Sequence, residues 1–258
     1  MSNEEGVRLS VALIGSTGRM GREVTKAIAS HSRLKLGASI DREALASMNQ
    51  SLELIKRCDI MIDFSTAAAQ ERVGRLISQL SEEEAIPLVT GVTGLSEAHQ
   101  ATLSAYAAIA PVFQASNFSL GVALLKRLAL IAAEALGEEY DTEVYELHHR
   151  HKLDAPSGTA ISLAEAVVEG KKLGGDQKAS LSFSHTTPRD PSAVQVSAGR
   201  GGGVFGDHSL FFLGEHERIE LSHSALNRSV FASGALRAAL WCIGRAPGFY
   251  HMEDLWER

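Results

Sequence analysis

The residues best suited to chemistry stand together just past the middle of the chain, in the segment 146–160, which reads ELHHRHKLDAPSGTA. Three of the ten histidines, one arginine and one lysine occupy positions 148–152. Histidine can donate a proton near neutral pH, and lysine can pair with a carboxylate or deliver a proton. Because neither a core nor an ordinary surface needs this concentration of cations, we interpret the segment as the reaction centre.

His148 and Lys152 are four positions apart in this cluster. The spacing puts both side chains on one face of a strand, by even parity, or of a helix, by the i, i+4 repeat. Either geometry would let them meet one substrate, so we take them as the candidate catalytic pair. The neighbouring Arg150 and His151 receive no role from the pattern.

A helix start follows the cluster at 157–159. Pro156 stiffens the approach to it, and Gly158 permits a ligand to come close. The first amides of a helix, together with the Thr159 hydroxyl, can hold a carboxylate. Cationic side chains and a helix N-terminus therefore converge, which favours a small acid, such as a dicarboxylate, as the substrate.

Metal binding is the main alternative for three neighbouring histidines, and a purely structural cluster is the second. The cluster lacks the HExxH order of helical zinc sites, and no cysteine or clear carboxylate set completes a ligand shell. Arg150 and Lys152 would also repel a cation, so we expect no metal. Four further histidines fit ordinary sheet or surface positions, namely His185, His208, His216 and His223.

The N-terminal half begins with the elements of a cofactor-binding domain. An apolar, branched run at 8–14 is typical of a buried parallel strand, and 15–21 (GSTGRMG) leads from it into a helical pattern. Glycines let the backbone approach a pyrophosphate, and a helix N-terminus offers amides and the positive end of its dipole. Thr17 replaces the second glycine of the usual GxGxxG pattern, so the turn alone is a weak signal.

The next strand strengthens this interpretation. Residues 34–40 are expected to form a strand that leads to Asp41, 20 residues beyond Gly21. An acid at about that distance normally binds the adenosine ribose hydroxyls, and the adjacent Arg42 could face a 2′-phosphate. The pair predicts NADH or NADPH as cofactor, with the use of both as a hypothesis.

The first half continues as an alternation of helical segments and buried strands, at 43–57, 58–64, 67–80, 86–90, 96–109 and 111–115. Such alternation predicts a parallel sheet with right-handed crossovers, whose ligands bind at the carboxyl ends of the strands. The turns at Gly15, Asp41, Gly91 and Asn117 would lie on that edge. Asp63, which ends one strand, could either contact the ligand or cap the next helix.

The second half opens with a long, almost wholly apolar helix over 119–136, with Leu120, Leu124, Leu128 and Ile131 at core spacing. We expect it to bridge two domains. Further strands follow without helices between most of them, at 140–147, near Phe183, and at 194–197, 208–213 and 219–223. They predict a mixed or antiparallel sheet of α+β type. One broad face of this sheet has no helix to cover it, which suggests self-association.

The expected fold class is therefore α/β, with an N-terminal Rossmann-type parallel sheet and a second α+β substrate domain built on a mixed sheet. An apolar helix at 229–243 is expected to return to the first domain. We expect a dinucleotide-binding domain at 1–117 plus 229–258, and a substrate-binding and oligomerisation domain at 118–228.

The overall composition restricts the possible partners. The chain has 258 residues and a net charge of −6 without a Lys/Arg run, which disfavours nucleic acid and acidic membranes. It has no apolar run of the roughly 18–20 residues that span a bilayer. Its N-terminus is unlike a secretory signal. Cys58 and Cys242 lie in apolar surroundings without CxxC spacing, which favours reduced core residues of a cytosolic protein.

The segment 146–160 resembles the signature of the 4-hydroxy-tetrahydrodipicolinate reductase (dihydrodipicolinate reductase) family. The resemblance extends over almost the whole chain, through GSTGRMG at 15–21, IDFS at 62–65, TGVTG at 90–94, SNFSLG at 116–121 and FASGALRAALW at 231–241. It implies a Rossmann domain, a mixed-sheet substrate domain and a homotetramer built through those sheets. It also implies NAD(P)H-dependent reduction of a heterocyclic dicarboxylate in diaminopimelate and lysine synthesis.

The resemblance also implies roles for individual residues. His148 takes the position of the proton donor and Lys152 that of a second catalytic residue, while His149, Gly158 and Thr159 match contacts to the substrate carboxylate. The implied cofactor contacts are Gly15, Ser16, Thr17, Gly18, Arg19, Met20, Asp41, Arg42, Gly91, Val92, Thr93, Ala115, Ser116, Asn117 and Phe118. The chain departs from the family pattern at Val92, in a short 41–58 segment and in a glycine-rich loop at 200–203.

Two other functions remain open. One is another two-domain NAD(P)-dependent reductase of amino-acid metabolism, such as a semialdehyde or homoserine dehydrogenase. A semialdehyde dehydrogenase needs a catalytic cysteine at a strand end, which neither Cys58 nor Cys242 provides. The other is a non-catalytic NAD(P)-sensing protein, which would have no reason to place His148, Lys152 and an anion-binding helix start together.

Overall fold

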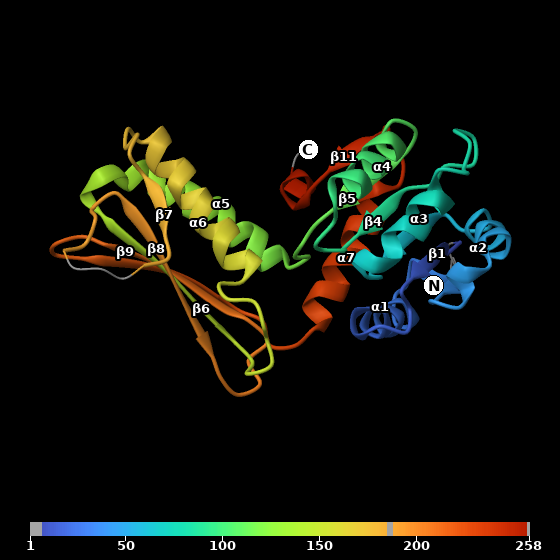
Figure 1. The fold of residues 1–258 in the computed structure, drawn as a ribbon, viewed down its shortest axis with the longest axis horizontal. Coiled ribbons are helices and arrows are strands. Elements are labelled where there is room, and N and C mark those ends of the chain that lie inside the picture. The colour runs from blue at the N-terminus through green and yellow to red at the C-terminus, as the bar shows by residue number, and fades with distance from the viewer. Residues whose placement is uncertain (1–6, 185–187, 257–258) are drawn as a thin grey trace, which may run out of the picture. The chain divides into compact units, whose positions relative to one another are not determined.

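The computed structural model describes residues 7–184 and 188–256, which fold into two compact units (Figure 1). The first unit combines Met1–Phe118 with Ser229–Arg258, and the second is Ser119–Arg228. One of the histidines considered above, His185, lies outside the described residues.

The first unit is built on a six-stranded parallel sheet, which confirms the predicted Rossmann-type architecture. Its strands are β1 (Leu9–Ile14), β2 (Leu34–Ile40), β3 (Ile60–Asp63), β4 (Leu88–Thr90), β5 (Pro111–Gln114) and β11 (Gly248–Tyr250), in the spatial order β11-β5-β4-β3-β1-β2. Every neighbouring pair is parallel. Because β2 and β3 pair on opposite sides of β1, the chain reverses its direction of travel there, and ligands bind at such switch points. The sequence did not predict β11, since three residues give no measurable alternation.

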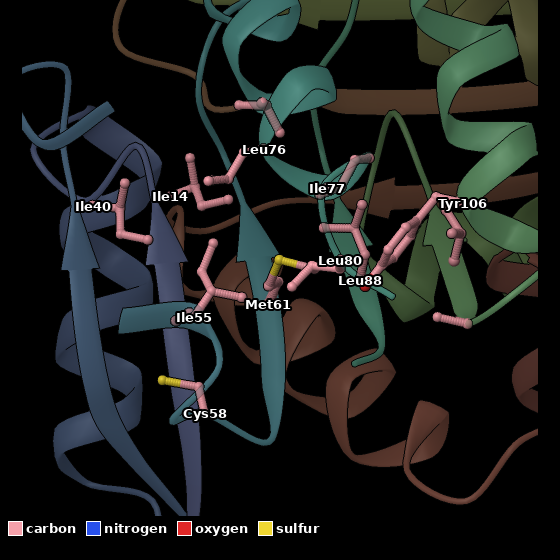
Figure 2. Packing of buried hydrophobic residues seen from close by; sticks show 14 of the residues in the cluster. Ile14, Ile40, Ile55, Cys58, Met61, Leu76, Ile77, Leu80, Leu88 and Tyr106 are labelled. Atoms are coloured by element: carbon pink, nitrogen blue, oxygen red, sulfur yellow. The ribbon is translucent and has the colours of Figure 1, made fainter. Parts of the chain in front are cut away.

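Helices cover both faces of this sheet. They are α1 (Arg19–Ala29), α2 (Met48–Ile55), α3 (Gln70–Ile77), α4 (Glu97–Ala107) and α7 (Ser229–Cys242), with short 3₁₀ turns η1 (Ala44–Ala46), η2 (Ala67–Ala69) and η4 (Met252–Trp256). Figure 2 shows Ile14, Met61 and Leu88 of the strands packed with Leu76 and Tyr106 of α3 and α4. On the other face, α7 packs against α1 and strands β3–β5, so the C-terminal helix does return to the first unit.

The second unit contains a five-stranded mixed sheet, which confirms the second part of the fold prediction. Its strands are β6 (Asp141–His148), β7 (Ser180–Ser182), β8 (Ala193–Arg200), β9 (Asp207–Leu213) and β10 (Arg218–Ser224), in the order β10-β9-β6-β8-β7. The pairs β6–β8 and β7–β8 are parallel, and β6–β9 and β9–β10 are antiparallel. Helices α5 (Leu120–Leu136) and α6 (Gly158–Leu173), with η3 (Gly137–Glu139), cover one face. Phe183 lies just beyond β7.

The core face predicted for α5 is wrong. Leu124, Leu128 and Ile131 are 48%, 41% and 50% exposed, whereas the buried side of the helix carries Val122, Ala123, Leu125, Ala129 and Ala133. Because α5 is apolar on all sides, the spacing of its apolar residues does not indicate which face is buried. The small side chains decide it, because α6 approaches so closely that a Cβ on Gly170 would lie 2.3 Å from the carbonyl oxygen of Leu130.

Two predictions from composition can be compared with the structure. Cys58 and Cys242 are both free and buried, as expected. None of the helices in the described ranges combines the length and the apolar character needed to cross a membrane.

Candidate active site

The loop after β6 carries most of the cationic cluster. Strand β6 ends at His148 and α6 begins at Gly158, so Lys152 lies on neither a strand nor a helix. The prediction that a regular repeat aligns His148 with Lys152 is therefore wrong. Lys152 Nζ instead donates to both carboxylate oxygens of Asp154, at 2.9 and 2.8 Å. This bond holds the pKa of the Asp154 carboxyl below its usual value.

A buried carboxylate, which the sequence did not single out, lies at the centre of the site. Glu146 is fully buried and accepts hydrogen bonds from His148 Nδ1, from the Ser157 backbone N–H at 3.1 Å and from Arg200 Nη1 at 2.9 Å. Arg200 Nη2 forms an ion-pair contact with the same carboxylate at 2.8 Å. Burial would raise the pKa of this carboxyl, but the bonds from Arg200 and His148 outweigh it and lower the pKa. Glu146 therefore stays ionised and holds the His148 ring.

The other edge of the His148 ring faces Gly206 and His208. A Cβ on Gly206 would lie 2.9 Å from His148 Nε2, so the missing side chain keeps the space beside that nitrogen open. The His208 ring packs edge-on against His148 with centroids 5.2 Å apart. Nε2 of His148 is thus the ring nitrogen that Glu146 does not contact.

His208 was expected to be an ordinary sheet or surface residue, and it does lie in β9, but it is almost completely buried within the site. Burial, reinforced by the nearby His148, lowers its pKa to about 4, which leaves the ring neutral at physiological pH. Its Nε2 lies 3.4 Å from the Ser157 hydroxyl. Among the described residues, no three His, Cys, Asp or Glu side chains are grouped in a way that could hold a metal ion.

The start of α6 has the form expected of an anion site. The Ser157 side chain caps the helix by accepting a hydrogen bond from the Ala160 N–H at 3.1 Å. A Cβ on Gly158 would meet nothing within 4 Å, so the first turn is open to a ligand. Thr159 follows it at a partly exposed position. Backbone amides and the Thr159 hydroxyl can therefore meet a carboxylate here.

Further cations surround His149. Burial lowers the pKa of this histidine, and the charges of Arg228 and His151 lower it further. The guanidinium of Arg228 lies 5.4 Å from the centre of the Phe205 ring, stacked over its face. The loop is fixed here by backbone bonds from the His149 N–H to Val204 and from the Gly201 N–H to His148. Sequence reasoning missed Arg228, because nothing in the pattern links residue 228 to the cluster at 148–152.

The first unit holds a separate cleft of ≈ 550 Å³ at the carboxyl ends of β1, β2 and β3. Five of the predicted cofactor residues line it, namely Gly15, Thr17, Gly18, Asp41 and Arg42, together with Phe64–Thr66 and Arg72. Gly15 has a φ of +77°, and its Cβ would lie 2.7 Å from the backbone of Phe64 and Ser65. Only glycine fits there, so the turn can present its backbone to a ligand.

Two carboxylates shape this cleft in different ways. Asp41 Oδ1 accepts hydrogen bonds from the backbone N–H groups of Glu43 and Ala44, at 3.0 and 2.9 Å. Asp63 is buried, which raises its pKa, and its oxygens accept bonds from the Ser65 N–H and the Gln70 side chain, both at 2.8 Å. Asp63 therefore fixes the turn after β3 that faces Gly15.

The other predicted cofactor residues lie outside the lining of this cleft. Ser16 is buried, and its hydroxyl oxygen accepts a bond from Ser39 at 2.8 Å. Arg19 and Met20 open α1. The segments 91–93 and 115–118 follow β4 and β5 on the same sheet edge, where Val92 and Phe118 are buried and Gly91 packs against the rings of Phe64 and Phe118.

A switch-point cleft with a glycine turn in one unit, and a carboxylate-held histidine beside a helix N-terminus in the other, define the class. The protein is a Rossmann-type NAD(P)H-dependent oxidoreductase with a separate mixed-sheet unit. The N-terminal family model of dihydrodipicolinate reductase matches residues 9–118, and the C-terminal model matches residues 121–256. The chain belongs to the dihydrodipicolinate reductase family, which confirms the resemblance found in the sequence.

Individual relatives agree with this assignment. The chain is 42% identical to a 4-hydroxy-tetrahydrodipicolinate reductase of Zymomonas mobilis subsp. mobilis, over 99% of each chain. It is 40% identical to the protein of that name from Thiobacillus denitrificans, over 95% of this chain and 97% of the relative. A dipicolinate-bound dihydrodipicolinate reductase from Paenisporosarcina sp. TG-14 shares the fold, with a TM-score of 0.73 at 21% identity over 95% and 98% of the chains.

Proposed function

We propose that the chain reduces 4-hydroxy-tetrahydrodipicolinate to tetrahydrodipicolinate with NADH or NADPH, as a step of diaminopimelate and lysine synthesis. The observation that carries the proposal is the His148 ring, which Glu146 holds by Nδ1 while Nε2 points to Gly206, a residue without a side chain. The names of the relatives at 40–42% identity support this choice of substrate.

We propose that the cofactor binds at the glycine turn, because the backbone of the turn and the N-terminus of α1 can bind a pyrophosphate. Asp41 Oδ2 is assigned to the adenosine ribose, since Oδ1 serves the backbone. Arg42 and Arg72 line the same cleft and offer two cations to a 2′-phosphate. The cleft therefore offers a partner both to the free ribose hydroxyls of NADH and to the 2′-phosphate of NADPH. We assign the remaining predicted contacts, at 16, 19–20, 91–93 and 115–118, to the rest of the dinucleotide.

The substrate carboxylates are assigned to the cationic end of the second unit. Gly158 and Thr159 at the start of α6 take one of them, assisted by the loop histidine His149. The Lys152 ammonium already donates two hydrogen bonds to the carboxylate of Asp154. We propose that a substrate carboxylate competes with Asp154 for this ammonium. Arg228 adds positive charge near His149.

The chemistry replaces the substrate hydroxyl by hydrogen. The hydroxyl and a hydrogen of the adjacent ring carbon leave together as water, which forms a C=C bond between the two carbons. The carbon that carried the hydroxyl then gains a hydride, and the adjacent carbon regains a proton. When bound, the reduced nicotinamide supplies the hydride. His148 gives the proton from Nε2 to the carbon that becomes electron-rich, while Lys152 holds the acid end of the substrate. Glu146 stabilises the protonated ring before the transfer. A positioned acid of this kind contributes about 10²–10⁴-fold to the rate.

The experiment that tests this proposal compares wild type with His148→Ala and Lys152→Ala, using substrate generated by the preceding synthase. We expect each variant to lower kcat by about 10²–10⁴-fold while NADH and NADPH binding, followed by nucleotide fluorescence, stays nearly intact. Wild-type protein that binds NADPH without oxidising it in the presence of substrate would favour a cofactor sensor instead. Loss of NADPH binding in either variant would contradict the assigned roles.

We further propose a cytoplasmic homotetramer assembled through the mixed sheets. Tyr145 and Leu213 are 41% and 39% exposed on the sheet face opposite Val144 and Phe212, which gives that face apolar area to bury. The two free cysteines support a reducing compartment. Sedimentation equilibrium of wild type and Tyr145→Glu tests the assembly, and a monomeric wild type would contradict it.

A further inference from the structure

We propose that Glu146 and Arg200 are positioning residues that fix the tautomer of His148 and link it to the loop that carries Lys152. This inference deepens the proposed function, because it rests on His148 being the proton donor. Neither residue need touch the substrate. They would act by setting which nitrogen of His148 carries the transferable proton and where that nitrogen lies.

The hydrogen bonds of Glu146 restrict the tautomer that His148 can adopt. Two of its donors are fixed, the Ser157 backbone N–H on Oε1 and Arg200 Nη1 on Oε2, and the cationic Arg200 Nη2 lies 2.8 Å from Oε1. An ionised carboxylate can only accept hydrogen bonds. His148 Nδ1, which contacts the same carboxylate, must therefore donate its hydrogen. The neutral ring is thus held as the Nδ1–H tautomer, and Nε2 is the position that gains and loses a proton.

The neighbouring groups agree with this assignment. His148 Nε2 faces the space left by Gly206, where a side chain would come within 2.9 Å. The adjacent His208 is buried and neutral, so it offers no competing charge to Glu146. Ser157 caps α6 and gives its backbone N–H to Glu146, so the same residue ties the carboxylate to the anion-binding helix start.

Arg200 extends the connection to the second proposed catalytic residue. Besides its hydrogen bond and ion-pair contact with Glu146, Arg200 donates from Nη2 to the backbone carbonyl of Asp154, and the carboxylate of Asp154 holds Lys152. Only 19% of the Arg200 side chain is exposed. One guanidinium therefore holds His148 through Glu146 and Lys152 through Asp154, from the end of β8.

The decisive variant is Glu146→Gln, which keeps the shape of the side chain and turns one oxygen into a donor. Ser157 N–H and Arg200 Nη2 both face Oε1, so the glutamine best keeps its oxygen there and places its amide at the position of Oε2. The amide loses the bond from Arg200 Nη1 and faces His148 Nδ1. That nitrogen must then accept, and the neutral ring changes to the Nε2–H tautomer. In serine proteases, a comparable change beside the catalytic histidine lowers kcat about 10⁴-fold. We expect kcat to fall about 10²–10⁴-fold with KM nearly unchanged.

The tautomer is measured from the ¹⁵N chemical shifts of histidine-labelled full-length protein, with His148→Ala identifying the signal. We expect Nδ1–H in wild type and Nε2–H in Glu146→Gln. Glu143→Gln is the matched control, because Glu143 lies on the same strand and faces the other side, where it accepts a bond from Ser197. This control should leave both tautomer and kcat unchanged. A Glu146→Gln protein with the wild-type tautomer or wild-type kcat would overturn the inference.

A double-mutant cycle separates this inference from the proposed function. If Glu146 acts through His148, Glu146→Gln causes no further loss of kcat in a His148→Ala background. An equal loss in both backgrounds would mean a merely structural role. If His148→Ala itself keeps full kcat, the proton-donor role of His148 in the proposed function fails, but the tautomer measurement still decides the positioning claim.

Arg200→Lys gives a second test, should the buried glutamine prevent folding. The lysine keeps one cationic donor, but it cannot span Glu146 and Asp154 together. We expect the Nδ1–H tautomer to persist and kcat to fall about tenfold or more, because Lys152 is held less well. Unchanged kcat in this variant would remove Arg200 from the proposal, and a changed tautomer would contradict the primary role of Glu146.

Discussion

Gly206→Ala is the substitution whose effect the structure defines best. Gly206 adopts a φ of +150°, a backbone conformation that side chains other than glycine rarely take. An added Cβ would lie 2.9 Å from His148 Nε2, 3.4 Å from His148 Cδ2 and 3.6 Å from His208 Cε1. The His148 ring cannot easily turn away, because Glu146 holds its Nδ1. The substitution therefore strains the backbone and displaces the proposed proton donor.

Both effects can be given a size. A residue in a sparsely populated backbone region costs on the order of 1–3 kcal/mol, and pushing a side chain off its rotamer costs about 0.5–1.5 kcal/mol. We therefore expect Gly206→Ala to lower the free energy of unfolding by about 1.5–4.5 kcal/mol. A misplacement of about 1 Å at a reacting group can cost about 10²-fold in rate, so kcat should fall by about that factor.

Gly201→Ala in the same β8–β9 connection is the matched control. Gly201 has ordinary φ, and a Cβ there would meet nothing within 4 Å, while its N–H would keep its bond to His148. The assays are denaturant unfolding and kcat under saturating substrate and NADPH. Gly206→Ala with wild-type kcat and stability, or an equal effect from Gly201→Ala, would refute the role given to the close approach of Gly206 to His148 Nε2.

Three further predictions concern stability and specificity. Because His208 has a folded pKa of about 4 and an ordinary unfolded pKa of about 6.5, the unfolded chain takes up the proton first as the pH falls, and stability is lost over that window. Wild type should lose on the order of 2 kcal/mol more than His208→Gln between about pH 7 and pH 5. Arg42→Ser should raise KM for NADPH about tenfold relative to NADH in steady-state assays, since it removes one phosphate partner. Leu125→Ala should cost about 2–5 kcal/mol in denaturant unfolding, and Leu124→Ala less than about 1 kcal/mol, because only Leu125 is buried.

Each of these has a clear contrary result. Parallel pH–stability curves for wild type and His208→Gln would show that His208 titrates normally in the folded protein. An unchanged ratio of the two KM values in Arg42→Ser would remove Arg42 from the phosphate contacts. Similar costs for Leu124→Ala and Leu125→Ala would mean that α5 buries both faces.

The sequence predicted the architecture well where a pattern and a turn coincided. Strand β2 matches the predicted bounds, and the mixed sheet follows from consecutive strands linked by glycine-rich loops. The buried face of α5 was predicted wrongly, because leucines lie all around that helix. The close approach of α6 determines which side is buried. A contact with another element is not encoded in the periodicity of one helix.

The candidate site was only partly predictable for a similar reason. The cluster at 148–152 and the helix start at 158 stood out by residue type, and the structure places both in the connection from β6 to α6. Glu146 could have been recognised, since its spacing of two from His148 puts both on one face of β6. Arg200 and His208 could not have been recognised as its neighbours, because only the pairing of β6 with β8 and β9 brings them close to Glu146.

The transfer of hydrogen from cofactor to substrate is the most direct test of the proposed function. NADPH deuterated at its transferable position is mixed with wild-type protein and synthase-generated 4-hydroxy-tetrahydrodipicolinate, and the product is analysed by mass spectrometry. We predict tetrahydrodipicolinate with one deuterium per molecule from wild type, and a rate of its formation about 10²–10⁴-fold lower from His148→Ala. Product without deuterium, or equal rates for the two proteins, would contradict the proposed reaction or the role of His148.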